Sequence, residues 1–79
     1  MHIEYFPETD TLYISLAGRT SAESQEIAPN VVADFDAEGR LVGIEIDPVK
    51  GLADLSHLET KGLPLTNLLL NSELAAARR

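Results

Sequence analysis

Residues 31–46, VVADFDAEGRLVGIEI, decide the fold of this chain. Apolar residues occupy alternate positions on both sides of a four-residue break, as Val31, Ala33, Phe35, Val42, Ile44 and Ile46. Successive side chains of a β-strand point to opposite faces, so this period of two indicates two half-buried strands. Residues 37–40 separate them, and Gly39 can take the positive φ that a tight turn needs. The stretch therefore predicts a β-hairpin.

The residues before this hairpin repeat the pattern. Residues 2–6 and 11–16 alternate in the same way, and residues 7–10 contain the proline and aspartate that are typical of a turn. Residues 23–27 form a shorter and more polar run, which suits an exposed edge strand. Because strands that follow one another usually pair, residues 1–47 are predicted to form an antiparallel β-meander of four to five strands.

Residues 48–79 predict one or two helices after the sheet. Pro48 is tolerated in the first turn of a helix, so residues 49–52 can form a short one, whereas residues 54–59 fit either a helical turn or extended chain. A break at 62–64 is followed by a leucine-rich helix over 65–79. Its apolar arc is wider than a small sheet needs. We therefore expect its leucines to contact another chain: Leu65, Leu68, Leu69, Leu70 and Leu74.

Length and composition predict one α+β domain over residues 1–79 with a thin core. Cysteine is absent, which excludes disulfides and thiolate metal sites. A second subunit is then the expected source of further buried apolar area, and we predict a homodimer. Neither a secretion signal nor a membrane-spanning run is found, so the expected compartment is the cytoplasm.

The charge is divided unevenly along the chain. Residues 1–47 hold ten acids and two bases, a net charge of −8, and residues 48–79 hold three acids and four bases, a net charge of +1. The acidic sheet segment repels phosphate backbones, which disfavours nucleic-acid binding. It attracts a basic protein instead.

The acids of the second hairpin nearly fit the calcium-loop pattern D-x-[DN]-x-[DN]-G-x5-E. Asp34, Asp36, Gly39 and Glu45 match, whereas Glu38 does not match the third ligand position. That loop requires helical flanks, and here both flanks alternate as strands do. A hairpin with a solvated acidic face is therefore the preferred interpretation. A cation site or an acid–base pair built from Asp34, Asp36 and Glu45 is the alternative, and no cofactor and no catalytic constellation are predicted.

Four spaced pieces of the sequence resemble the bacterial family called domain of unknown function 2283. They are Ile3-Glu4-Tyr5, residues 10–14, residues 27–36 and residues 39–46. The resemblance implies no catalytic residue, because the family has no assigned function. It does imply a size typical of antitoxins, and some members are thought to be encoded beside a small ribonuclease-like toxin.

These features favour a non-enzymatic protein-interaction module, with an antitoxin-like partner of a small basic toxin as its most specific form. Two alternatives stay open. One is a small metal-binding or acid–base enzyme domain that uses the acidic face of the second hairpin. The other is a structural homodimer.

Overall fold

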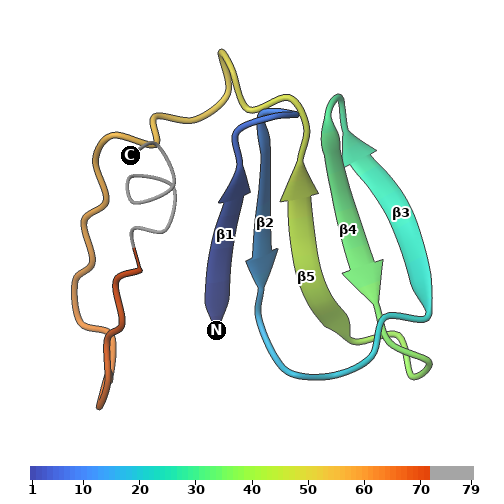
Figure 1. The fold of residues 1–79 in the computed structure, drawn as a ribbon. Coiled ribbons are helices and arrows are strands. Elements are labelled where there is room, and N and C mark those ends of the chain that lie inside the picture. Colours follow the sequence, from blue (N-terminus) through green and yellow to red (C-terminus); the bar gives the residue numbers. More distant parts are fainter. Residues whose placement is uncertain (72–79) are drawn as a thin grey trace.

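A computed structural model describes residues 1–71, and it contains a single five-stranded antiparallel sheet (Figure 1). The strands are β1 (His2–Phe6), β2 (Thr11–Ser15), β3 (Glu23–Ala28), β4 (Val31–Phe35) and β5 (Leu41–Ile46). Four strands lie where the alternation of apolar residues predicted them, and β3 lies at the polar run over residues 23–27. The antiparallel sheet expected over residues 1–47 is therefore confirmed.

The strand order is β1-β2-β5-β4-β3. The β1–β2 hairpin and the β3–β4–β5 meander follow the chain, but residues 16–22 carry it past β5 to the far edge (Figure 1). Hydrogen bonds from Leu16 N to Val42 O (2.8 Å) and from Ala22 N to Phe35 O (2.7 Å) hold this crossover. The order places the apolar strands β2 and β5 inside the sheet and the polar β3 at an edge, where its side chains meet solvent.

One face of the sheet carries two rows of uncharged side chains. The first row runs across the strands as Tyr5, Leu12, Ile46, Val31 and Ala28. The second runs as Ile3, Ile14, Ile44, Ala33 and Gln25. We call these ten residues the apolar face. Its polar groups, the Tyr5 hydroxyl and the Gln25 amide, lie on the two edge strands.

The opposite face is polar and acidic. One row contains Glu4, Tyr13, Glu45, Val32 and Glu26. The next contains His2, Ser15, Gly43, Asp34 and Ser24. We call these ten residues the polar face, and they include four acids but no lysine or arginine. The hairpin acids Asp34 and Glu45 thus lie on the face that the sequence assigned to them.

Gly43 is required at its place in the centre of the polar face. A Cβ added there would lie 2.5 Å from the Tyr13 hydroxyl oxygen and 2.9 Å from the Ile14 carbonyl oxygen. The glycine lets the Tyr13 ring lie against the backbone of β5. This arrangement explains why an otherwise regular apolar–polar alternation contains a glycine at 43.

The core is thin, as expected for a chain of this length. Its most buried apolar side chains are Leu12, Ala33, Val42 and Val49. Val49 belongs to the turn that follows β5, and this turn is held by two bonds to Asp10. They run from Val49 N to Asp10 O and from Lys50 N to Asp10 Oδ2, both 2.9 Å. Residues 49–52 form this turn rather than the short helix that Pro48 suggested.

The predicted C-terminal helix is not present in the described part of the chain. Residues 54–71 contain neither helix nor strand, and residues 72–79, including Leu74, lie outside the described residues. Leu65, Leu68, Leu69 and Leu70 are 51–83% exposed. A helix gains most of its stability from packing its apolar side, and these leucines pack against little within residues 1–71. Within the same residues, no helix is long and apolar enough to cross a membrane.

Candidate functional site

The turn between β4 and β5 is built around one carboxylate. Asp36 Oδ1 accepts hydrogen bonds from the backbone amides of Glu38 (2.9 Å) and Arg40 (2.8 Å). Gly39 takes a φ of 82° and donates its amide to Asp36 O at 3.0 Å. An aspartate that accepts nearby amides and a glycine at positive φ are the two residues this type of turn requires.

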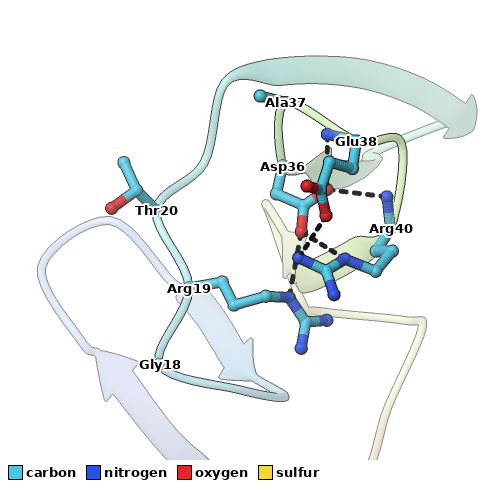
Figure 2. A pocket seen from close by; sticks show the side chains of 7 residues that line it. All are labelled: Gly18, Arg19, Thr20, Asp36, Ala37, Glu38 and Arg40. Atoms are coloured by element: carbon cyan, nitrogen blue, oxygen red, sulfur yellow. Dashed lines mark hydrogen bonds and ion pairs between the residues drawn. The ribbon is translucent and has the colours of Figure 1, made fainter.

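Two arginines converge on the same carboxylate (Figure 2). Asp36 Oδ2 lies 2.8 Å from Arg40 Nε and 3.1 Å from Arg19 Nε, and Asp36 is 8% exposed. Arg19 comes from the crossover and also donates Nη2 to Leu41 O at 2.9 Å. Arg40 reaches back to Glu38 at 2.7 Å. Asp36 thus joins the crossover to the second hairpin.

These contacts favour the ionised form of Asp36. The hydrogen bond from the Arg40 amide lowers the pKa of the Asp36 carboxyl, and the Arg40 side chain and the Glu38 amide lower it further. The carboxylate is therefore the form that the fold stabilises. An open hollow next to it is lined by Gly18, Arg19, Thr20, Ala37, Glu38 and Arg40 (Figure 2).

The hairpin interpretation of the calcium-loop pattern is confirmed, because β4 and β5 flank Gly39. Asp36, at the second ligand position of that pattern, is already bonded to two guanidinium groups and two backbone amides. Asp34 and Glu45 lie apart from it on the polar face. Within residues 1–71, no three His, Cys, Asp or Glu side chains are gathered as metal ligands.

Asp34 is held by two hydroxyl groups on the polar face. Tyr13 Oη donates to Asp34 Oδ2 at 3.0 Å, and Ser24 Oγ donates to Asp34 Oδ1 at 2.6 Å. Burial and the bond to Asp34 raise the pKa of the Tyr13 hydroxyl. The three side chains come from β2, β4 and β3, so this network links strands across the sheet. Both carboxylate oxygens accept a bond, which is typical of a structural network.

The apolar face has the properties of an interaction surface. Its central residues Ile14, Ile44, Ile46 and Val31 come from the three inner strands, yet each is only half-buried. At the β1 edge, Ile3 is 49% and Tyr5 is 37% exposed. Inner-strand isoleucines become fully buried when a second layer lies on the sheet. Among residues 1–71, no second layer of helices or strands lies on this face (Figure 1), although two of its ten residues, Leu12 and Ala33, are buried.

A groove runs along the β1 side of this face. Side chains of β1 and β2 form one wall, and the C-terminal segment contributes Leu55, Leu58 and Asn71. Both imidazoles line it, with His2 3.5 Å from Glu4 and His57 3.9 Å from Glu59. The leucines predicted to contact another chain, Leu65 and Leu68 to Leu70, are not among the residues that line it.

The sequence missed two features of these sites. The alternation of apolar and polar residues predicted which face of its own strand each side chain lies on. It could not predict the two cross-strand rows of the apolar face, because these depend on the order of the five strands. The role of Arg19 was also missed, because nothing in a loop sequence indicates that a residue 17 positions away will be its partner. The role of Asp36 could have been predicted. An aspartate just before a glycine-containing turn commonly accepts hydrogen bonds from backbone amides of that turn.

The chain matches the model of a family described as "Protein of unknown function (DUF2283)" over residues 2–50. The match contains all five strands and the first two residues of the turn that follows β5, Val49 and Lys50. It confirms the resemblance noted in the sequence. No curated protein and no solved structure matches the chain.

Proposed function

The chain belongs to this DUF2283 family, whose function is unknown, and we propose that it is a non-enzymatic protein-interaction module. One observation carries the proposal: isoleucines in the middle of the sheet, Ile14 and Ile44, are only half-buried, and the two cross-strand rows of the apolar face contain no charged residue. A protein surface of this kind is typical of a site that another polypeptide covers.

The size of the face supports this proposal. Five strands about 4.8 Å apart, each about five residues long at about 3.3 Å per residue, give a face of roughly 400 Å² in projection. Contiguous apolar patches of that size on a monomer are often functional. A chain of 79 residues without cysteine has few other sources of stability, so covering the face also stabilises the sheet.

The polar face supports a more specific proposal, a basic protein partner. Glu4, Glu45 and Glu26 lie in one cross-strand row, and no ion pair with lysine or arginine is found for any of the three within residues 1–71. Together with the net charge of −8 over residues 1–47, this row favours a positively charged surface. An antitoxin-like module that covers a small ribonuclease-type toxin has these properties.

The neighbouring carboxylates do not favour the alternative of a metal or acid–base enzyme. Asp36 is ion-paired with Arg19 and Arg40, and Asp34 is bonded to Tyr13 and Ser24. Acid–base catalysis by a carboxyl group requires a pKa raised towards neutrality, whereas that of Asp36 is lowered.

The interaction proposal is tested with two matched baits, Ile44→Thr on the apolar face and Val32→Thr on the polar face. Both changes keep a β-branched residue on an inner strand, so strand propensity is preserved. Wild type and Val32→Thr are expected to retain the same protein, which Ile44→Thr loses. Equal behaviour of all three baits, with no protein retained and no self-association, would contradict the proposal.

The antitoxin form is tested by co-expression with the product of the adjacent reading frame. The expected result is relief of growth inhibition, together with a complex that weakens between about 50 and 500 mM salt as screening increases. Glu45→Gln should weaken that complex, and Glu59→Gln, in the C-terminal segment, should not. A complex that is insensitive to salt, or the absence of any complex, would contradict a basic partner.

A further inference from the structure

We propose that the apolar face is covered by a second copy of this chain, so that two sheets pack face to face around a two-fold axis near Ile44. The inference rests on the proposed function and names the occupant of its surface. β5 is the middle strand of the five, and Ile44 lies at the centre of the second row of the apolar face. A residue near a two-fold axis meets its own counterpart.

The chain itself offers little to cover this face. The C-terminal segment lies beside β1, where Leu55 and Leu58 approach the groove (Figure 1). Leu55 and Leu58 are nevertheless 46% and 72% exposed. Neither residue reaches Ile44 or Val31, which do not line that groove. Residues 72–79 contain one large apolar residue, Leu74, which is too little for a face that spans five strands.

Charge favours a second copy in this geometry. The chain carries a net charge of −7, so two copies repel one another when acidic surfaces meet. The two rows of the apolar face contain no charged residue, and Glu4, Glu45, Glu26 and Asp34 lie on the opposite face. The one strand acid on the apolar side is Glu23, which pairs with Phe35 at the rim, on the edge strand β3. Packing through the apolar face therefore keeps these four acids on the two outer surfaces and Glu23 at the exposed rim, where water solvates them.

The distribution of side chains also suits a sheet sandwich. Two sheets pack about 10 Å apart with the side chains of their inner faces interdigitating. The centre of this face is made of Ile14, Ile44, Ile46 and Val31, and its polar groups lie at the rim on Tyr5 and Gln25. An apolar centre with a polar rim is the common arrangement in subunit interfaces.

The area is sufficient for association of modest affinity. Two apolar faces of roughly 400 Å² each contribute most of the interface, and Leu55 and Leu58 beside β1 add to it. The total buried area is about 1,000 Å², near the lower limit for specific interfaces. Dimerisation should therefore depend on concentration in the micromolar range. A second copy is also present wherever the chain is made, which favours its binding by mass action.

Sedimentation equilibrium of the full chain from about 2 to 200 µM provides the first test. The expected mass at the upper end is twice the 8.6 kDa of one chain. Ile44→Thr should weaken dimerisation by roughly 30- to 100-fold, because a symmetric interface loses the contact twice. Val32→Thr should leave it unchanged. A wild-type mass of 8.6 kDa at 200 µM would overturn the inference.

Isotope-filtered NMR on an equal mixture of labelled and unlabelled wild-type chains provides the second test and needs no variant. Contacts between copies are expected at the methyl groups of Ile14, Ile44, Ile46 and Val31. Contacts confined to Leu65–Leu70 would overturn the proposed interface. If the chain is monomeric but Ile44→Thr loses a different protein that Val32→Thr keeps, this inference fails while the interaction module stands.

Discussion

The sheet and the C-terminal segment differ in what their apolar residues do. In residues 2–50, alternation, cross-strand pairing and turn aspartates act together, and four apolar side chains are nearly completely buried. In residues 54–71, apolar residues are about as frequent and all of them are leucines, but each is about half or more exposed. The hydrogen bonds found there are local, from Ser56 to Asp54 and from Leu65 to Leu63. Apolar content alone therefore does not produce structure, which also needs a partner surface.

The largest expected difference between the two regions is the effect of truncating a leucine. Leu12→Ala removes a side chain that is 7% exposed on an inner strand, and we expect it to lower the free energy of unfolding by about 2–5 kcal/mol. Leu69 is 82% exposed, and Leu69→Ala should change that free energy by less than about 0.5 kcal/mol. Urea unfolding followed by circular dichroism measures both. Comparable losses would show that the C-terminal segment is part of the cooperative fold.

The second difference concerns backbone space in the sheet. Gly43→Ala places a Cβ 2.9 Å from the Ile14 carbonyl oxygen, and a strand backbone cannot move away without loss of pairing. We expect a loss of about 1–3 kcal/mol in the free energy of unfolding. Gly18→Ala is the matched control, since nothing lies within 4 Å of its Cβ position. If Gly43→Ala is tolerated as well as Gly18→Ala, Tyr13 does not lie against β5 as described.

The two regions should also respond differently to acid. Asp36 and Asp54 both have a lowered pKa: the main causes are the Arg40 amide for Asp36 and the Ser56 hydroxyl for Asp54. A carboxyl group with a lowered folded-state pKa stabilises the fold above its unfolded pKa. That stabilisation is lost as the pH falls through the folded-state pKa, which for both groups lies below the ordinary value of an aspartate. Only the partners of Asp36 join separate parts of the fold, so only Asp36 should couple acid to unfolding of the sheet.

This pH prediction is measured with Asp36→Asn and Asp54→Asn in urea at pH 7 and pH 3. Asp36→Asn should be less stable than wild type at pH 7 and should lose less on acidification. Asp54→Asn should follow wild type at both values. The prediction is wrong if Asp36→Asn and wild type show the same dependence on pH.

The contrast also explains how far the sequence could predict the molecule. Alternation located four of the five strands, because the side-chain period is a local property that is visible in residues such as Val42 and Ile44. The polar strand β3 was predicted from its composition and its place between turns. The crossover at 16–22 could not be predicted in the same way. The pairing of β2 with β5 depends on which strands bury the most apolar area when they occupy the centre of the sheet, and that is not a local property. The proposed interface differs from the one expected from the sequence for a related reason. The leucine pattern after residue 64 is typical of a helix, but formation of that helix depends on a surface to pack against.

The smallest expected effect tests where the interface lies. Replacement of Leu65, Leu68, Leu69 and Leu70 by serine removes the residues that the sequence assigned to a partner contact. Their exposure of 51–83% predicts no change in melting temperature. Because they lie outside the proposed interface on the apolar face, the sedimentation mass should also stay that of the wild type. Ile44→Thr, a single change on the apolar face, should weaken association far more than these four together. If the quadruple variant dissociates and Ile44→Thr does not, the leucine segment forms the interface, and the open face of the sheet must have another role.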